Sequence, residues 1–334
     1  MSMTSAQTIT TSTTETSTSA ADLEQALVDA LNHPYHSISS AWLYDQRGSE
    51  LFEEITQLPT YYPTRTEIGI LEENLDAIAS AIGADSLVVE LGSGSSRKTV
   101  PVLNALNQPA GYVPVDISAD YLYQASADLV KKLPKLPNRP NLPVIPLVAD
   151  FTTEFELPPS LPPHTSRLGF FPGSTIGNLT VQAAQTLLRR CHALLGDGAA
   201  FLIGIDLDKS PDVLIPAYDD PEGVTAAFNR NLLTRLNREL GVAIDVDAFA
   251  HEARYFADPA RIEMHLVASC DQTIEVAGQV FTLAAGDSLH TEMSHKYTIE
   301  GFKQLAKEAG WQLTQHWTDS QSRFALLLLH SSTQ

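Results

Sequence analysis

The stretch SLVVELGSG, residues 86–94, is the segment from which the architecture of this chain can be inferred. Its apolar run is typical of a buried β-strand, and the run closes on Glu90 and a leucine before two glycines, Gly92 and Gly94. Glycine after a strand lets the backbone reach positive φ and approach a ligand closely. We therefore predict a strand that turns directly into a ligand-binding loop.

Strand and helix patterns alternate on the C-terminal side of this loop. Helical patterns cover residues 98–106, 119–133 and 181–196, and strand patterns cover residues 111–118, 141–151, 167–178 and 199–207. Such alternation is typical of a mostly parallel sheet with helices on both faces. We predict an α/β fold with a doubly wound, Rossmann-like sheet.

Residues 209–297 leave this rhythm, because they carry a helix of their own and hairpin-like strands. We predict that they form an inserted α+β domain, which recognises the substrate together with the aromatic segment 21–65. Residues 66–208 and 298–331 form the nucleotide-binding sheet domain, and a helix capped by Thr64 opens it. The Ser- and Thr-rich residues 1–20 are predicted to be a disordered tail.

Composition excludes several classes of partner. The 334 residues contain 21 Lys and Arg against 40 Asp and Glu, a net charge of −19, which disfavours nucleic acid and anionic membranes. No apolar run approaches the ~20 residues that span a bilayer. The N-terminus shows no signal or transit pattern, so we expect a cytoplasmic protein. We also expect a monomer. Cys191 and Cys270 lie far apart and are predicted to be buried free thiols.

The ends of the second and third predicted strands suggest a nucleoside ligand. Asp116 lies 22 residues after Gly94, where doubly wound folds carry the carboxylate for ribose hydroxyls. Asp150 and Phe151 stand where an acid can accept from an adenine amine while an aromatic ring covers the base. The loop GSGSSR, residues 92–97, lacks the third glycine of nicotinamide-binding loops. It favours S-adenosylmethionine and methyl transfer.

Four blocks resemble one family. YYPTRTE (61–67), ELGSG (90–94), FPGSTIGNL (171–179) and TEMS (291–294) together resemble the histidine-specific N-α-methyltransferases of ergothioneine biosynthesis. The resemblance runs from about residue 22 to residue 330. It implies that free histidine is methylated three times, giving hercynine.

The resemblance also implies residue roles. The residues implied to bind S-adenosylmethionine are Gly92, Ser93, Gly94, Lys98, Asp116, Asp150 and Phe151. Those implied to bind histidine are Tyr61, Asn178, Tyr218, Met264, Glu292 and Ser294, with Tyr44 and Gly173 near the reacting nitrogen. Within that set, Asn178 and Tyr218 would hold the carboxylate, and Glu292 and Ser294 would hydrogen-bond the imidazole. Taken alone, Met264 reads as a core residue.

Alternatives remain open at this point. A buried Glu292 facing an imidazole makes a charge-assisted hydrogen bond and favours a protonated ring, whereas an indole leaves part of the carboxylate unpaired. The same fold could nevertheless methylate tryptophan or another aromatic amino acid. A catalytically silent partner module and a nicotinamide oxidoreductase are further alternatives. His265, His290 and His295 lack metal-ligand spacing, so we expect no metal and place them on the surface or in the core.

Overall fold

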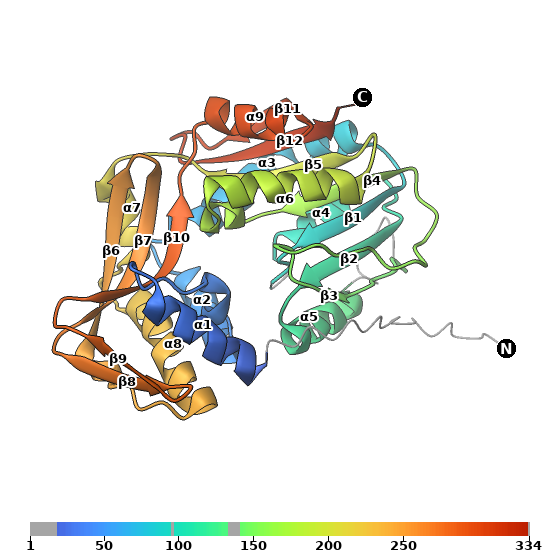
Figure 1. Ribbon diagram of the computed structural model, residues 1–334. Helices are drawn as coiled ribbons and strands as arrows, with labels where there is room; N and C mark the ends of the chain where they lie inside the picture. Colours follow the sequence, from blue (N-terminus) through green and yellow to red (C-terminus); the bar gives the residue numbers. More distant parts are fainter. Residues whose placement is uncertain (1–18, 95–96, 133–140, 333–334) are drawn as a thin grey trace.

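The computed structural model describes residues 19–94, 97–132 and 141–332. Its larger half is a seven-stranded sheet in the order β11-β12-β5-β4-β1-β2-β3 (Figure 1). The strands are β1 (Ser86–Leu91), β2 (Gly111–Asp116), β3 (Leu147–Val148), β4 (Ser166–Phe171), β5 (Ala200–Asp206), β11 (Trp311–Thr318) and β12 (Phe324–Ser331). The first five run parallel, while β12 and β11 are antiparallel to their neighbours. The predicted Rossmann-like sheet is confirmed.

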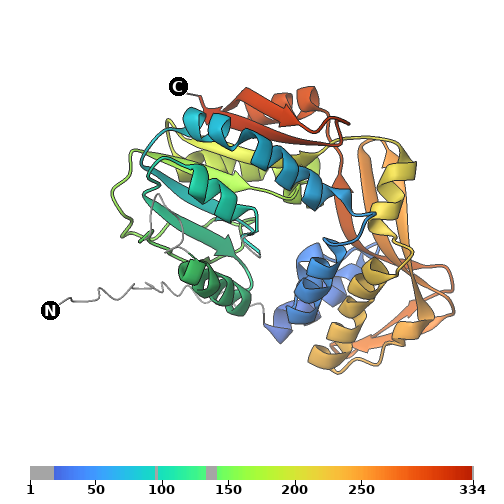
Figure 2. The same cartoon turned by 180° about the vertical axis from the view of Figure 1, so that it is seen from behind.

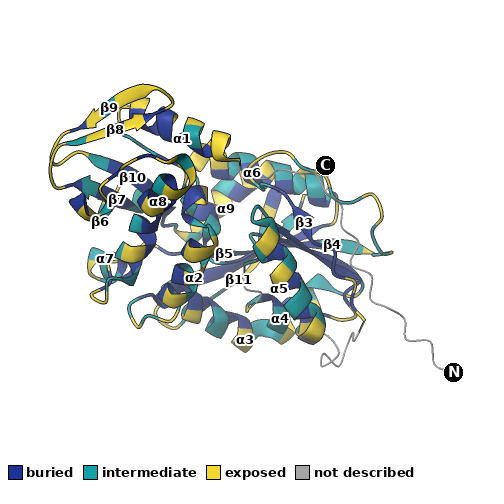
Figure 3. Cartoon of the chain, turned by 90° about the horizontal axis from the view of Figure 1, so that it is seen from below, coloured by how far each residue is buried: buried dark blue, intermediate teal, exposed yellow. Residues whose placement is uncertain are grey.

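Helices cover both faces of this sheet. One face carries α3 (Tyr62–Ile82), α4 (Thr99–Ala105) and α5 (Ala119–Lys132), and the other carries α6 (Val181–Leu195) and α9 (Ile299–Glu308). Figure 2 shows the first face and Figure 1 the second. The central strands are buried between two apolar clusters, whereas the helices expose their outer sides (Figure 3). This burial explains why β1 and β5 read as continuous apolar runs.

Helix α3 begins three residues earlier than predicted. Thr64 was expected as the cap, but the helix starts at Tyr62, and Tyr61 makes no side-chain cap hydrogen bond. Pro63 occupies the first turn, where its missing N–H costs nothing because that position has no intrahelical partner. The Arg65 guanidinium donates to the carbonyl oxygens of the preceding turn and holds it in place.

The smaller half combines the N-terminal segment with the insertion. Its elements are α1 (Ala20–Asn32), η1 (Ser40–Leu43), α2 (Gln46–Ile55), α7 (Pro211–Tyr218), α8 (Val224–Leu240), η4 (Val246–Ala248), the sheet β10-β7-β6 and the hairpin β8–β9. The strands are β6 (Phe249–Ala257), β7 (Ala260–Ala268), β8 (Gln272–Val276), β9 (Gln279–Leu283) and β10 (Ser288–His295). One apolar cluster joins the two segments, as Figure 1 shows for α1, α2 and α8.

Three expectations concern the termini, the cysteines and the membrane. The predicted tail falls mostly on residues 1–18, which lie outside the described residues, while Ser19 caps α1 and Ala20 begins it.

Cys191 is buried in α6, but Cys270 is exposed because it lies just beyond the end of β7, which corrects the prediction of two buried thiols. Within the described ranges, no helix is long and apolar enough to cross a bilayer.

Candidate active site

A cavity of about 460 Å³ opens where the carboxyl ends of the parallel strands face the smaller half. Open α/β sheets bind their ligands at this edge. The predicted site residues that line it are Tyr44, Tyr61, Gly92, Ser93, Gly94, Lys98, Asp116, Asp150, Phe151, Gly173, Asn178, Tyr218, Glu292 and Ser294. Met264 does not line it, because α7 and α8 pack over β7 and enclose Met264 in the apolar core.

The loop after β1 is anchored to β2 by backbone hydrogen bonds. The N–H groups of Gly92 and Ser93 donate to the carbonyl oxygen of Val115 at 2.8 and 3.3 Å. Gly92 has a φ of +64°, and a Cβ there would lie 3.5 Å from the ring of Phe151. Glycine therefore lets the backbone of this loop lie close to the Phe151 ring at the edge of the cavity.

Two carboxylates and a phenyl ring line the cavity beyond this loop. Burial raises the pKa of Asp116, which accepts a hydrogen bond from the N–H of Ser118 at 3.0 Å. Oδ1 of Asp150 accepts from the N–H and the hydroxyl of Thr152 at 2.8 and 2.6 Å. Phe151 packs edge-on against Phe171, with ring centroids 5.3 Å apart. These contacts hold the three predicted cofactor residues at the ends of β2 and β3.

Glu67 connects the two sides of the cavity, although the sequence analysis gave it no role. The side chain is fully buried in α3, and its Oε2 lies 2.5 Å from the ammonium of Lys98. Both carboxylate oxygens also accept from the N–H of Gly173, at 3.0 and 2.9 Å. The Gly173 amide is therefore occupied, and its carbonyl oxygen is the backbone group left for a ligand.

The loop after β4 explains why the block FPGSTIGN is so specific. Ser174 adopts the left-handed conformation with φ of +56°, and its hydroxyl accepts from the N–H of Asp206 at 2.8 Å. A Cβ on Gly177 would lie 2.8 Å from the carbonyl oxygen of His295, so only glycine lets this loop approach β10 so closely. Asn178 follows, and its side chain lines the cavity without a hydrogen-bond partner among the described residues.

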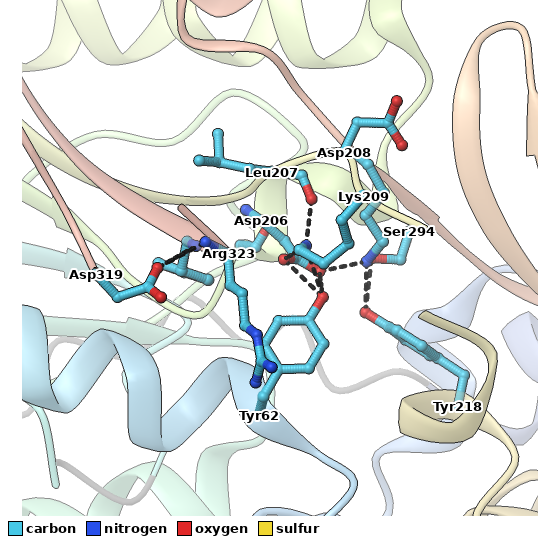
Figure 4. Close-up of polar contacts among 12 residues, drawn as sticks. Tyr62, Asp206, Leu207, Asp208, Lys209, Tyr218, Ser294, Asp319 and Arg323 are labelled. Carbon is cyan, nitrogen blue, oxygen red and sulfur yellow. Dashed lines mark hydrogen bonds and ion pairs between the residues drawn. The ribbon is translucent and has the colours of Figure 1, made fainter. Parts of the chain in front are cut away.

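Tyr218 and Ser294 meet in a buried polar cluster (Figure 4). Their hydroxyl oxygens are 3.0 Å apart, and the ammonium of Lys296 donates to both, at 2.8 and 2.9 Å. The same ammonium pairs with Asp206 at 2.7 Å, and Tyr62 donates to that carboxylate. The sequence analysis missed Lys296, although its spacing continues the alternation of Glu292 and Ser294 along β10.

A β-bulge sets the direction of Glu292. The register between β10 and β7 shifts between His290, which pairs with His265, and Glu292, which pairs with Met264. Simple alternation would place His290 and Glu292 on one face, but the extra residue Thr291 puts them on opposite faces. The Thr291 hydroxyl anchors the bulge by donating to Oδ1 of Asn229 at 2.6 Å.

Burial dominates the electrostatics of this end of the cavity. It raises the pKa of Glu292 to about 7, against the opposing effects of the Lys296 charge and the Tyr44 hydroxyl. Oε2 of Glu292 has no hydrogen-bond partner among the described residues. The pKa values of Tyr44, Tyr61 and Tyr218 lie well above 10, mainly through burial, so these phenols stay protonated and act as hydrogen-bond donors.

The histidines near this site do not gather around a metal. His290 lies against His265 with ring centroids 5.2 Å apart, and its Nδ1 contacts the hydroxyl of Ser37 at 2.7 Å. Both histidines are buried on the face of β10 and β7 opposite Glu292. Across the ranges that the structure describes, no group of three or more His, Cys, Asp or Glu side chains could hold a metal ion.

The raised pKa of Glu292 predicts a pH-dependent stability in the ligand-free protein. The folded state holds this proton up to about pH 7, whereas the ordinary value is 4.5, so the associated stability is full below 4.5 and is lost as the pH rises through 7. We expect Glu292→Gln to gain on the order of 3 kcal/mol relative to wild type between about pH 4.5 and about pH 8. Urea unfolding of both proteins at about pH 5.5 and about pH 8 measures this. Parallel pH profiles would contradict the assignment.

The family model for histidine-specific, S-adenosylmethionine-dependent methyltransferases matches residues 23–331. The chain is 41% identical over 298 residues to the histidine N-alpha-methyltransferase of Mycolicibacterium smegmatis, covering 87% of this chain and 89% of that protein. It is 38% identical over 311 residues to the enzyme of that name from Mycobacterium tuberculosis, covering 92% and 94%.

A solved structure bears on the fold alone. The S-adenosylmethionine-dependent methyltransferase from Clostridium acetobutylicum superposes with a TM-score of 0.50 at 11% identity, covering 85% of this chain and 99% of that one. The family match is independent of this likeness and spans nearly all described residues. The chain belongs to the family of histidine-specific, S-adenosylmethionine-dependent methyltransferases.

Proposed function

We propose that this chain methylates the α-amino group of free L-histidine with S-adenosylmethionine, in three rounds that give hercynine, the first step of ergothioneine biosynthesis. The observation that carries the proposal is Glu292, a buried acid that faces the same cavity as the glycine loop after β1. An imidazole N–H is the natural partner of its unpaired oxygen, because an unpaired buried acceptor costs about 1–3 kcal/mol.

The remaining substrate contacts follow from the cavity walls. Ser294 lies beside Glu292 on the cavity face of β10 and reaches the second imidazole nitrogen, while Tyr61 packs against the ring. Tyr218 and the unpartnered amide of Asn178 hold the carboxylate. This arrangement directs the α-amino group toward the loops after β1 and β4. Met264 does not contact the substrate; it is the core residue that pairs with Glu292 on the neighbouring strand and supports it.

The cofactor half fits S-adenosylmethionine. The cavity wall formed by Asp150 and the Phe151 ring suits a flat base, and Asp116 suits ribose hydroxyls. Lys98 pairs with Glu67 through one oxygen and retains further N–H donors for a carboxylate. Asp150 would accept from an exocyclic amine, and Ser93 and Gly94 complete the loop. When bound, the cofactor supplies an electrophilic methyl group on a sulfonium.

Positioning of a neutral amine is the main catalytic task of the protein. A free α-amino group is mostly protonated near pH 7, so the site must select the neutral form and direct its lone pair. The carbonyl oxygen of Gly173 accepts an amine N–H, and the Tyr44 ring faces the nitrogen. The raised pKa of Tyr44 makes a tyrosinate base unfavourable. In each round the neutral nitrogen gains one positive charge, which the aromatic face stabilises, and the mono- and dimethylated ammonium must lose a proton before the next round.

We further propose a division of labour between the two halves. Residues 21–65 and 209–297 recognise the amino acid, and residues 66–208 and 298–331 hold the cofactor. Support comes from the cavity, whose substrate-facing wall includes Tyr44, Tyr218 and Glu292. One chain supplies every wall of that cavity, so a monomer suffices, and light scattering after size exclusion should return the mass of a single chain.

The decisive test is a substrate panel. The purified chain is incubated with S-adenosylmethionine and each standard free amino acid in turn, and product masses are read. Trimethylated histidine with nothing from tryptophan supports the proposal. Methylation of tryptophan or another aromatic amino acid instead would overturn the substrate assignment, and cofactor binding without any product would indicate a silent module.

Asp116 provides a test of the cofactor site. We expect Asp116→Ala to weaken S-adenosylmethionine binding about 10- to 100-fold, because hydrogen bonds to a charged acceptor contribute about 1.5–3 kcal/mol. Calorimetric titration of the cofactor measures the change in Kd. Asp120→Ala is the matched control, since Asp120 is an exposed acid four residues later and should leave Kd unchanged. Equal Kd values for Asp116→Ala and wild type would refute this assignment.

A further inference from the structure

Asp206, the last residue of β5, serves two ammonium groups at once. Its Oδ1 lies 2.7 Å from Nζ of Lys209, and its Oδ2 lies 2.7 Å from Nζ of Lys296. The Tyr62 hydroxyl donates to both carboxylate oxygens at 2.8 Å. Figure 4 shows Tyr62 pointing at this carboxylate and Tyr218 approaching the cluster from the other side. Three donors therefore converge on the Asp206 carboxylate: two ammonium groups and one phenol.

Lys296 is the lysine of this cluster that contacts the residues lining the substrate cavity. Its side chain is 0% exposed, and its three N–H groups go to Asp206, to the Tyr218 hydroxyl and to the Ser294 hydroxyl. The ammonium also lies 4.5 Å from the centre of the Tyr218 ring. Tyr218 and Ser294 line the cavity, whereas Lys296 stands behind them.

The charges of this cluster do not balance. Two lysines share one carboxylate, so one positive charge is left over in a buried environment, where unpaired charge is costly. Asp208 is exposed and hydrogen-bonds to Tyr255. Glu292, on β10, is a buried acid that interacts electrostatically with Lys296, but its raised pKa leaves it only partly ionised near neutrality. The cluster is thus locally positive in a chain of net charge −19.

A ligand carboxylate at the Tyr218 hydroxyl would supply the missing negative charge. Lys296 donates to the Tyr218 oxygen, and the Ser294 hydroxyl can donate to it as well, which leaves the phenol proton for an acceptor in the cavity and polarises it toward that acceptor. A carboxamide or a hydroxymethyl group at the same place could accept the hydrogen bond but would leave the charge uncompensated.

We propose that Lys296 is a positioning residue that acts through Tyr218 and makes the enzyme select substrates with a free α-carboxylate over their amides. This inference rests on the proposed function, because it takes the amino-acid carboxylate to lie at Tyr218. It assigns the preference for free amino acids over amidated or peptide-linked ones to a buried lysine that does not touch the substrate.

The test is a cycle between one enzyme charge and one substrate charge. Values of kcat/KM are measured for L-histidine and L-histidinamide with wild type and with Lys296→Met. We expect the histidine-to-histidinamide ratio to fall at least about tenfold in the variant. The different amine pKa of the amide cancels, because it affects both enzymes alike. An equal loss on both substrates, with the ratio unchanged, would show a merely structural role and overturn the inference.

Two further variants and a binding measurement make the result robust. Lys296→Met leaves Asp206 and Lys209 as a one-to-one ion pair. If that variant does not fold, Tyr218→Phe is measured in its place. It keeps Lys296 but removes the phenol hydroxyl through which Lys296 acts, and it should lower the same ratio. Lys209→Met also leaves a one-to-one ion pair, but it keeps the hydrogen bond from Lys296 to Tyr218, so it should lower the ratio clearly less than Lys296→Met does. Kd ratios in the presence of S-adenosylhomocysteine give the same comparison without turnover.

Failure of the proposed function has a different signature. If wild type neither binds nor methylates histidine, the substrate assignment fails, and the cycle is run on the amino acid that the panel identifies and on its amide. If Lys296→Met lowers the ratio of kcat/KM for that amino acid to kcat/KM for its amide, the role of Lys296 is supported although the histidine assignment is wrong. A ratio that does not respond to Lys296→Met with that substrate overturns the inference as well.

Discussion

Replacing Glu292 by alanine is expected to lower kcat/KM for histidine about 100-fold, mainly through KM. The carboxyl group is buried on β10, and its Oε2 has no partner among the described residues. Alanine would leave the imidazole N–H without its protein acceptor in a largely buried part of the cavity, which costs about 1–3 kcal/mol. Catalysis is affected less, since the reacting nitrogen is positioned at the other end of the substrate.

Substrate selection should change along with affinity. Glu292→Ala removes the group that an indole or a phenyl ring cannot satisfy, so the preference for histidine over tryptophan and phenylalanine should narrow. Competition assays with mixed amino acids and mass detection measure this directly. Glu292→Gln separates charge from hydrogen bonding, because it keeps an acceptor of nearly the same shape. Glu275→Ala, at an exposed acid of β8, is the matched control.

An unaltered preference in Glu292→Ala would place the imidazole elsewhere in the cavity. A loss of cofactor binding in the same variant would point instead to a general distortion of the site. Calorimetry with S-adenosylmethionine distinguishes these outcomes, because the proposed cofactor contacts lie at the ends of β1, β2 and β3 rather than on β10.

The second large effect is expected from Gly177→Ala. A Cβ at this position would lie 2.8 Å from the carbonyl oxygen and 3.2 Å from the amide nitrogen of His295. These are backbone atoms of β10, so they cannot rotate away, and the loop after β4 must move. We expect a stability loss of about 1–3 kcal/mol. Turnover should fall about 100-fold, because a shift near 1 Å displaces Asn178 and Gly173 from the substrate.

Thermal unfolding and steady-state kinetics on the same preparations measure both effects. Gly69→Ala is the matched control, since a Cβ in the middle of α3 would meet nothing within 4 Å. That substitution should raise stability by about 0.5–1 kcal/mol, as alanine loses less backbone entropy than glycine in a helix. Wild-type activity in Gly177→Ala would show that the loop can relax without moving Asn178.

Residues close to one another along the chain were predictable because their roles follow local rules. The turn after β1 needs glycines at Gly92 and Gly94, and their φ values of +64° and +45° agree with that reason. Asp116 could be placed because parallel strands end at one edge of the sheet. Met264 reads as a core residue from its apolar strand, and it lies in the core. The resemblance implied a role in histidine binding, but Met264 does not line the cavity.

The direction of side chains on β10 was harder to predict. Glu292 and Ser294 share a face by simple alternation, and the same rule would add His290. The bulge at Thr291 instead places His290 on the face opposite Glu292. The bulge is anchored by Asn229, a residue 62 positions away along the chain. A sequence pattern carries no record of such an anchor, because the partner is chosen by packing between α8 and the sheet.

The sequence by itself determined the parallel sheet, the glycine loop and the residues at strand ends, because period, turn chemistry and strand order are local properties. Only the tertiary structure decided which buried charges meet. Asp206 and Lys296 are 90 residues apart, and Tyr218 and Lys296 are 78 apart, yet each pair lies within hydrogen-bond distance. Burial makes these contacts strong and obligatory, and burial is set by how the insertion folds back on the sheet.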